Sequence, residues 1–238
     1  MTTAAVHGFE GITGAESGKS SLFAINPQTG HILQRFDLST AKAGLLGDMC
    51  VAADGTVYVT DSLGGGVYRV RGDLNTAHLE KIAGDFISPQ TPVLSQDGKR
   101  LFVADYSLGI AVIDLNNTSD TRLHYLPHPE TVAVTGIDGL YRFENNLIAI
   151  QNGTGPHRLM RFTLNPRQTV IISSTVIEQS ISGRTDATHA VISHGAYYVS
   201  TNSGWDKVDD SGHLQKGLQF SPPLILRIPP PGSHPHSH

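Results

Sequence analysis

The fold is decided by residues 49–72, MCVAADGTVYVTDSLGGGVYRVRG, and by three later segments that repeat their pattern. The pattern is a small apolar strand, a turn, a second strand that ends in a polar pair, and a third apolar strand. Its later copies are residues 92–115 (PVLSQDGKRLFVADYSLGIAVIDL), residues 139–164 (GLYRFENNLIAIQNGTGPHRLMRFTL) and residues 190–229, which begin AVISHGAYYVSTNSG. Each copy therefore predicts three consecutive antiparallel strands.

The turn between the first two strands of each copy carries residues that tolerate a positive φ. These turns are Asp54-Gly55, Asp97-Gly98, Asn145-Asn146 and His194-Gly195. Such residues supply the backbone conformation that tight hairpins need. Weaker fourth strands follow the first three copies, at residues 78–84, 120–126 and 170–178. The copies recur roughly every 43 to 50 residues, which is the length of one four-stranded propeller blade. A β-sandwich is also all-β, but it does not require such regular repetition.

Composition agrees with short strands and excludes several functional classes. The 238 residues include 25 glycines, only 16% are charged, and the formal net charge is −4. Nucleic-acid binding would require a basic face, and a membrane span would require about 18 apolar residues in a row; neither pattern is present. The N-terminal residues do not read as a signal peptide. Cys50, the only cysteine, lies in an apolar run, where a buried inert thiol is expected.

Both ends of the sequence predict an incomplete ring. Residues 21–38 read as a hairpin that supplies the third and fourth strands of a blade whose first two strands are absent. The last copy is followed by PPPGSHPHSH, which cannot continue a sheet because proline lacks an amide donor. We therefore expect an all-β propeller with about four and a half blades of a six-bladed ring. One incomplete domain would span residues 1–230, followed by a disordered His-rich tail at residues 231–238.

An open ring has two consequences that the sequence predicts. Its unpaired strand edges favour self-association. A longer form with one or two additional N-terminal blades is also expected, in which Met1 is not the true start. The compartment of such a form is left open by the sequence.

Four stretches resemble the gluconolactonase/regucalcin-like family of six-bladed propellers. They are residues 56–72 (TVYVTDSLGGGVYRVRG), 88–115 (SPQTPVLSQDGKRLFVADYSLGIAVIDL), 135–153 (TGIDGLYRFENNLIAIQNG) and 197–206 (YYVSTNSGWD). The resemblance implies a small-molecule ligand in the central channel and metal-dependent hydrolysis of a lactone or ester. It also implies one divalent cation, Ca²⁺, Mn²⁺, Mg²⁺ or Zn²⁺, that polarises the substrate carbonyl and lowers the pKa of a bound water.

The repeat register places candidate site residues on one rim of the channel, where first strands start and second strands end. Strand starts supply Gly47 with its neighbour Asp48, then Gln90, Asp138 and either Thr188 or His189, and strand ends supply Asp61, Asp105, Asn152 and Asn202. By resemblance, the metal-holding Asp of the family's Asp-Gly motif matches Asp138, which becomes the candidate catalytic residue and metal ligand. The family's Asn-Gly motif falls on Gln90-Thr91, so Gln90 is an altered second ligand. The family's Glu ligand has no counterpart.

The remaining candidates are assigned to substrate binding: Asp48, Asp61, Asp105, Asn152, His189 and Asn202. The Asp and Asn side chains at strand ends could instead bond loop backbone, as they do in turns. Trp205 could wall a ligand pocket or cap the last blade. A non-catalytic binding propeller, or a degenerate fragment without activity, is the alternative function. Residues 11–21, GITGAESGKSS, lack the first Gly of a phosphate-binding loop and precede a strand, so no nucleotide is expected.

Overall fold

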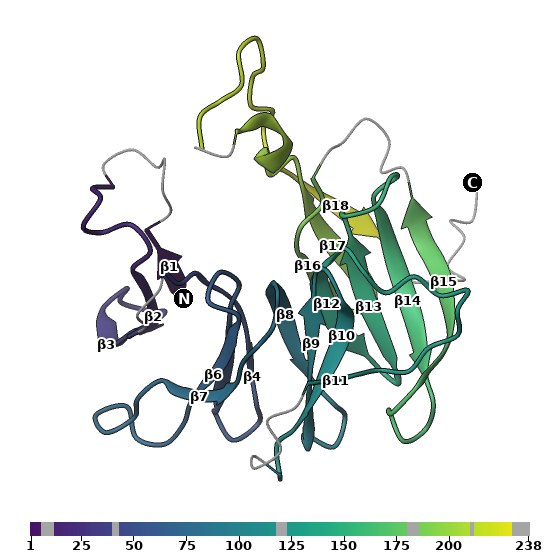
Figure 1. The fold of residues 1–238 in the computed structure, drawn as a ribbon, viewed down its shortest axis with the longest axis horizontal. Coiled ribbons are helices and arrows are strands. Elements are labelled where there is room, and N and C mark those ends of the chain that lie inside the picture. Colours follow the sequence, from purple (N-terminus) through teal and green to yellow (C-terminus); the bar gives the residue numbers. More distant parts are fainter. Residues whose placement is uncertain (6–11, 40–42, 118–122, 180–185, 210–211, 230–238) are drawn as a thin grey trace.

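The computed structural model describes residues 1–5, 12–39, 43–117, 123–179, 186–209 and 212–229. In these ranges the chain forms five antiparallel sheets, three with four strands and two with three. The sheets follow one another in chain order and stand in an arc around a central space, as Figure 1 shows. The protein is an all-β, five-bladed propeller, which confirms the fold class; a ring of six blades stays a prediction.

The strands of each blade run outward in chain order from the central channel. The first two blades contain β1 (Thr2–Ala4), β2 (Ser20–Ile25) and β3 (Ile32–Asp37), then β4 (Leu46–Val51), β5 (Val57–Asp61), β6 (Gly66–Val70) and β7 (Glu80–Ala83). The third blade contains β8 (Pro89–Leu94), β9 (Arg100–Asp105), β10 (Gly109–Asp114) and β11 (His124–Tyr125). The last two contain β12 (Ile137–Phe143), β13 (Asn146–Gln151), β14 (Arg158–Leu164) and β15 (Ile171–Gln179), then β16 (Ala190–Ser193), β17 (Ala196–Thr201) and β18 (Leu224–Ile228).

The first blade differs from the sequence prediction. The N-terminal hairpin is β2–β3, and β1 pairs with β2 on its other side. The Thr2 hydroxyl donates to the Gly47 carbonyl of β4 at 2.8 Å, so β1 lies beside the inner strand of the next blade. The hairpin therefore supplies the second and third strands of this blade, and its assignment as third and fourth strands is wrong. Residues 2–4 carry too short a pattern to reveal a strand before its partner is known.

A second difference is a shift of one residue in the fourth blade. The turn there is Glu144-Asn145, with Glu144 at φ 55°, and β13 already begins at Asn146. The second strand of this blade consequently ends at Gln151, not at Asn152 as the register predicted. In the fifth blade the turn is at His194-Gly195 as predicted, but the second strand ends at Thr201 and not at Asn202. Residues 231–238, the expected tail, lie outside the described residues.

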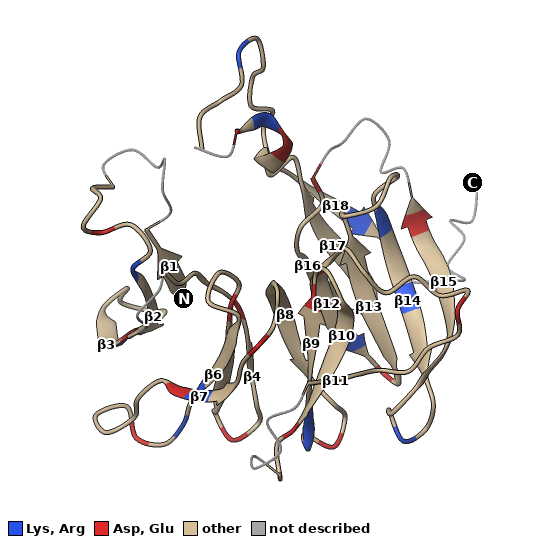
Figure 2. Cartoon of the chain, in the orientation of Figure 1, with Lys and Arg blue, Asp and Glu red and all other residues tan. Residues whose placement is uncertain are grey.

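Hydrophobic side chains pack between neighbouring blades. In β13, Leu147 and Ala149 pack toward the third blade, while Ile148 and Ile150 pack toward the fifth. Both faces of the strand are buried, so its sequence is nearly continuously apolar and does not alternate. Figure 2 shows the strands mainly without charge, with charged residues concentrated at strand ends and in turns. Within the described residues, no helix is long and apolar enough to cross a membrane.

Buried polar side chains stand at the ends of the second strands of the blades. The Asp105 carboxylate is fully buried and accepts hydrogen bonds from the backbone amides of Ile87, Ser88 and Ser107 at 3.0, 3.4 and 3.2 Å. Asp61 accepts in the same way from Leu45 and Gly64 at 2.7 and 2.9 Å. These contacts fix the loop that leads into the inner strand of the same blade, because a buried amide left without an acceptor is costly.

Asp105→Ala tests this anchoring. Loss of the carboxylate leaves three loop amides without their acceptor, so we expect the free energy of unfolding to fall by about 3 kcal/mol. Urea unfolding measures the difference. Asp73→Ala, at an exposed turn where the carboxylate accepts from the amide of Asn75, is the control and should cost less than about 1 kcal/mol. Equal losses for both variants would contradict a special role for Asp105.

Candidate functional site

A cavity of about 480 Å³ lies on the rim where the inner strands begin. Its lining includes all of the strand-start candidates and one strand-end candidate, namely Gly47, Asp48, Gln90, Asp138, Asn152, Thr188 and His189. Sequence reasoning did not single out four further lining residues, Leu45, Ser62, Ser88 and Tyr106, nor the carboxylate Asp186. Trp205, whose role was open, also lines the cavity. Side chains far apart in the sequence are thus brought to one place.

Three predicted substrate-binding residues lie outside this cavity. Asp61 and Asp105 are fully buried beneath it and hold loop backbone, which is the alternative role that the sequence left open. The Asn202 amide donates to the Pro222 carbonyl at 3.1 Å. Ser62 and Tyr106, which directly follow the two buried aspartates, are the residues that reach the cavity.

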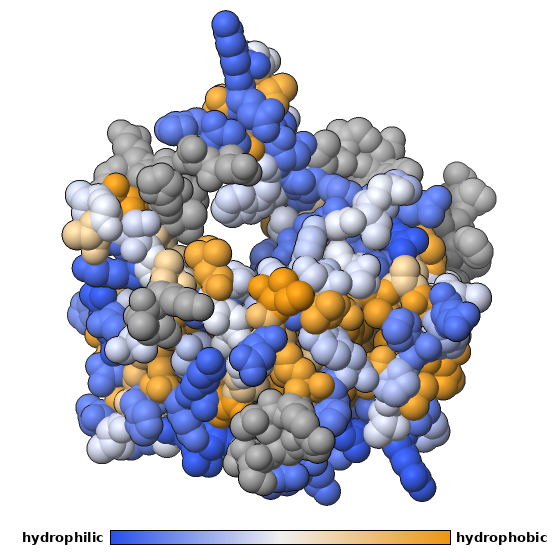
Figure 3. All heavy atoms as spheres, in the orientation of Figure 1, coloured by the Kyte–Doolittle hydropathy of each residue, from blue (hydrophilic) through white to orange (hydrophobic). Residues whose placement is uncertain are grey.

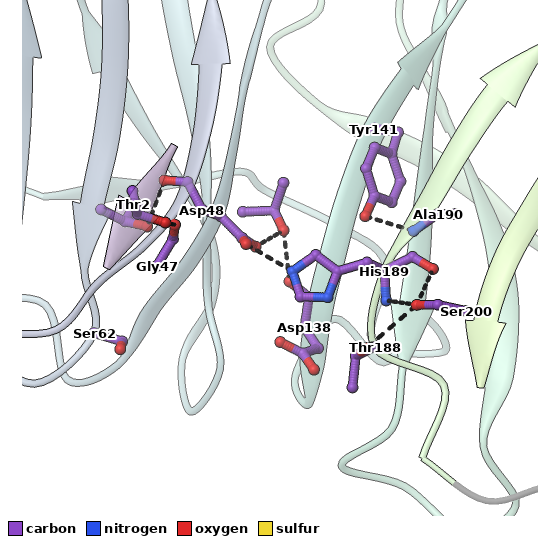
Figure 4. Close-up of polar contacts among 12 residues, drawn as sticks. Thr2, Gly47, Asp48, Ser62, Asp138, Tyr141, Thr188, His189, Ala190 and Ser200 are labelled. Carbon is purple, nitrogen blue, oxygen red and sulfur yellow. Dashed lines mark hydrogen bonds and ion pairs between the residues drawn. The ribbon is translucent and has the colours of Figure 1, made fainter. Parts of the chain in front are cut away.

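The central contact of the site joins Asp48 to His189. Asp48 belongs to β4, and His189 directly precedes β16, so the pair spans the channel between the second and fifth blades. The Asp48 Oδ1 and His189 Nε2 atoms are 2.6 Å apart, and Figure 4 marks their contact with a dashed line. The Thr91 hydroxyl donates to the other carboxylate oxygen of Asp48. The carboxylate therefore holds the imidazole ring in one orientation across the channel.

The backbone of His189 is fixed by Ser200 on the adjacent strand β17. Ser200 donates its amide to the His189 carbonyl at 2.8 Å, and its hydroxyl oxygen accepts from the His189 amide at 3.3 Å. The neighbouring Ala190 amide donates to the Tyr141 hydroxyl of β12 at 2.7 Å. Fixed backbone and fixed ring together make this histidine a preorganised group.

Asp138 forms a second polar cluster beside the pair. A β-bulge between Ile137 and Gly139 interrupts the register of β12 at this residue, and bulges re-aim side chains in this way. Asp138 Oδ2 accepts from the Asn152 amide at 2.8 Å, and the Tyr106 hydroxyl donates to Asn152 Oδ1 at 3.0 Å. A Cβ at Gly139 would lie 2.8 Å from the Thr188 carbonyl oxygen. The Asp-Gly pair thus lets the strand approach His189 closely.

The two titratable groups have shifted pKa values for different reasons. Burial raises the pKa of the Asp138 carboxyl, and the Asn152 hydrogen bond opposes this shift only in part. The hydrogen bond to Asp48 raises the pKa of His189 above its usual value near 6.5, while burial of the ring acts in the opposite direction. Asp138 therefore keeps its proton to a higher pH than an ordinary aspartate, and His189 is a stronger base than an ordinary histidine.

Trp205 is brought to the cavity by a long excursion between β17 and β18. It begins a single turn of 3-10 helix, η1 (Trp205–Lys207), and the Asp206 amide in that turn donates to Asp186 Oδ2 at 2.8 Å. Asp186 has a φ of 50°, a conformation that non-glycine residues rarely adopt. No repeat of the blade pattern marks this excursion, so sequence register could not have assigned it to the site.

The expected metal ligands do not form a metal site in this arrangement. Asp138 and Gln90 both line the cavity, but one Asp138 oxygen already accepts from Asn152, and the Gln90 amide donates to the Ser88 hydroxyl at 2.9 Å. Asp48 and His189 are hydrogen-bonded to each other. In the described part of the chain, no three His, Cys, Asp or Glu side chains gather as metal ligands would. Because these side chains are already engaged with one another, their arrangement does not fit a divalent cation.

Comparison with known proteins supports the fold. Neither a protein-family model nor a curated protein matches this sequence. Among solved structures, a proposed 6-phosphogluconolactonase from Bacteroides uniformis is 14% identical with a TM-score of 0.55, covering 90% of this chain and 69% of its own. The periplasmic gluconolactonase of Pseudomonas aeruginosa is also 14% identical, with a TM-score of 0.51 and coverage of 89% and 67%. A nidogen/laminin complex gives a TM-score of 0.56 at 14% identity, with coverage of 78% and 67%.

These likenesses establish a propeller that is shared by lactonases and by proteins of other kinds. The structural neighbours therefore include gluconolactonase-type propellers at low identity. Membership in the gluconolactonase/regucalcin-like family stays a prediction, because one fold carries many functions.

The Asp48–His189 contact predicts a specific dependence of stability on pH. Since the folded-state pKa of His189 is raised, its contribution is fully present below about pH 6.5 and is lost as the pH rises through the folded-state pKa. We expect the difference in free energy of unfolding between the parent and Asp48→Asn to be largest at low pH and to shrink above neutrality. Urea unfolding at several pH values measures it.

His189→Gln provides the control for this experiment. In that background, Asp48→Asn should have an effect that does not vary with pH through this range, because no imidazole is present to titrate. A parent-to-variant difference that stays constant from about pH 5 to 9 would show that the pair contributes no linked stability.

Proposed function

We propose that the cavity binds a small lactone or ester and hydrolyses it, with His189 as general base and Asp48 as the residue that orients it. The observation that carries the proposal is the 2.6 Å contact between Asp48 Oδ1 and His189 Nε2 inside a cavity large enough for a small molecule. The lactonase propellers among the structural neighbours support the choice of substrate class.

The geometry suggests how protons would move. With Nε2–H donated to Asp48, the second ring nitrogen of His189 is free of a proton and can accept one from water. The resulting hydroxide attacks the carbonyl carbon, and the ring C–O bond of the lactone breaks in the following step. Asp138, protonated to a higher pH than an ordinary aspartate, would donate its proton to the departing alkoxide, and transfer of the proton from His189 to Asp138 through solvent would then restore both groups. The product is a hydroxy acid, and the reaction needs no oxidant or further reactant.

The Gln90 amide in the lining would bind the carbonyl oxygen. Gln90 reaches the cavity, and its amide donates to the Ser88 hydroxyl at 2.9 Å, which holds it in place before a ligand binds. A donor aimed at the developing oxyanion stabilises the transition state more than the ground state. Asn152 donates both of its amide hydrogens, to Asp138 and to the Ala187 carbonyl, so its role is to position Asp138.

His189→Gln and Asp48→Asn test the proposal on δ-valerolactone, with acid release followed by an indicator dye. We expect kcat/KM to fall by about 10²-fold or more for His189→Gln, the range that general-base catalysis contributes. Asp48→Asn should retain some activity. The acidic limb of its pH–rate profile should move to lower pH, because His189 loses the partner that raises its pKa. Asp97→Asn, in an exposed hairpin turn, is the control and should keep parental activity.

Assays with EDTA, and with added Ca²⁺, Mn²⁺ or Zn²⁺, distinguish this proposal from the metal-dependent alternative. Activity that persists in EDTA supports the His189 mechanism. Activity that vanishes in EDTA, returns with one cation and is lost in Asp138→Asn would replace it with metal catalysis through Asp138 and Gln90. Absence of hydrolysis under every condition would leave a binding propeller.

A further inference from the structure

We propose that the ligand of this cavity is amphiphilic, with a polar head in the cavity and an aliphatic chain lying on an apolar ledge beside it. The ledge consists of Leu63, Ile87 and Leu108, residues that are 60%, 58% and 47% exposed. The inference deepens the proposed function, because it names the class of lactone or ester that the site would take.

The ledge is continuous with the cavity along the chain. Leu63 directly follows Ser62, and Ile87 directly precedes Ser88; both serines line the cavity. Leu108 lies two residues beyond Tyr106, which also lines it. Each apolar side chain therefore stands within one or two residues of a polar lining residue, on the loops that surround the mouth.

Hydrogen bonds hold the three ledge segments together. Asp105 accepts from the Ile87 amide through Oδ2 at 3.0 Å, and its carbonyl accepts from the Leu108 amide at 3.2 Å. The Phe86 amide donates to the Gly65 carbonyl at 3.3 Å, which joins the Leu63 loop to the Ile87 loop. Gly65 has a φ of 67°, and a Cβ there would lie 2.4 Å from the Phe86 carbonyl oxygen, so only glycine allows this approach.

The three exposed residues thus lie on segments that are hydrogen-bonded to one another beside the cavity. Figure 3 shows hydrophobic residues gathered beside the opening at the centre of the molecule. Solitary exposed leucines are ordinary, but a cluster that adjoins a binding cavity indicates a ligand surface.

The extent of the ledge favours an alkyl chain over a protein partner. A stable protein interface buries roughly 800 Å² on each partner, far more than three side chains provide. An alkyl chain needs only a narrow apolar track, and each fully buried methylene strengthens binding about fourfold. The cavity has a polar lining and apolar side chains at its rim, so it matches a ligand with a polar head and an aliphatic chain.

A chain-length series tests the inference. The substrates are δ-valerolactone, δ-octalactone, δ-decalactone and δ-dodecalactone, and the corresponding 6-alkyl δ-lactams measure affinity by calorimetry without turnover. We expect kcat/KM and lactam affinity to rise about two- to fourfold per methylene until the chain passes the ledge. Values that do not depend on chain length would overturn the inference.

The triple variant Leu63→Ser, Ile87→Ser, Leu108→Ser should flatten this dependence and leave δ-valerolactone hydrolysis near the parental value. All three side chains are exposed, so folding is retained. Val191→Ser with Ile225→Ser, which removes exposed apolar side chains from β16 and β18, is the matched control and should keep the parental slope. A slope unchanged in the triple variant would show that the chain does not lie on the ledge.

The lactams separate failure of this inference from failure of the proposed function. If no lactone is hydrolysed but lactam affinity rises with chain length and falls in the triple variant, hydrolysis is wrong and the amphiphilic ligand stands. If δ-valerolactone is hydrolysed but neither readout depends on chain length, hydrolysis stands and the ledge has no role in binding.

Discussion

Each blade of this protein can bury its apolar faces only against its neighbours, and the rest of the structure follows from that constraint. A strand such as β13, covered on both sides, must carry hydrophobic residues almost throughout. Charged side chains are then concentrated at the ends of strands and in turns, as Figure 2 shows. Because inner strands begin and second strands end on the same rim, the polar side chains of the candidate site lie on that rim. The site is thus a consequence of how the core is covered.

Buried polar side chains connect this core to the site. Asp61 and Asp105 are placed at the ends of second strands and bind the amides of the loops that lead into the channel. In the fourth blade, Gln151 does the same work with a neutral side chain, since its amide donates to the Ala133 and Thr135 carbonyls at 3.0 and 2.8 Å. A carboxylate serves where the loop presents amides, and an amide serves where the loop presents carbonyls. These contacts therefore set the positions of the residues that line the cavity.

The Asp48–His189 pair gives the channel a polar centre that no single blade could provide. Its partners come from the second and fifth blades, and Asp138 approaches from the fourth. Such a pair needs a rigid arc of blades between its two ends, since an error in the position of any blade would separate them. Stability and chemistry are therefore coupled here: the contact that orients the imidazole also ties distant blades together. The apolar ledge depends on the same scaffold, because Asp105 fixes two of its three segments.

The sequence by itself determined most strands, most turns, the repeat and the rim on which Asp48, Gln90, Asp138, Asn152 and His189 lie, because these depend on short apolar runs and on residues that tolerate positive φ. It misplaced one turn: Glu144 adopts that conformation although a glutamate rarely does. It also missed β1, which is too short to be recognised without its partner. Only the tertiary structure decided which side chains meet. Asp48 and His189 are 141 positions apart, and Trp205 reaches the cavity on an excursion outside the repeat. Those contacts depend on how the blades are rotated and stacked around the channel, which is set by packing between sheets and is not written in any one segment.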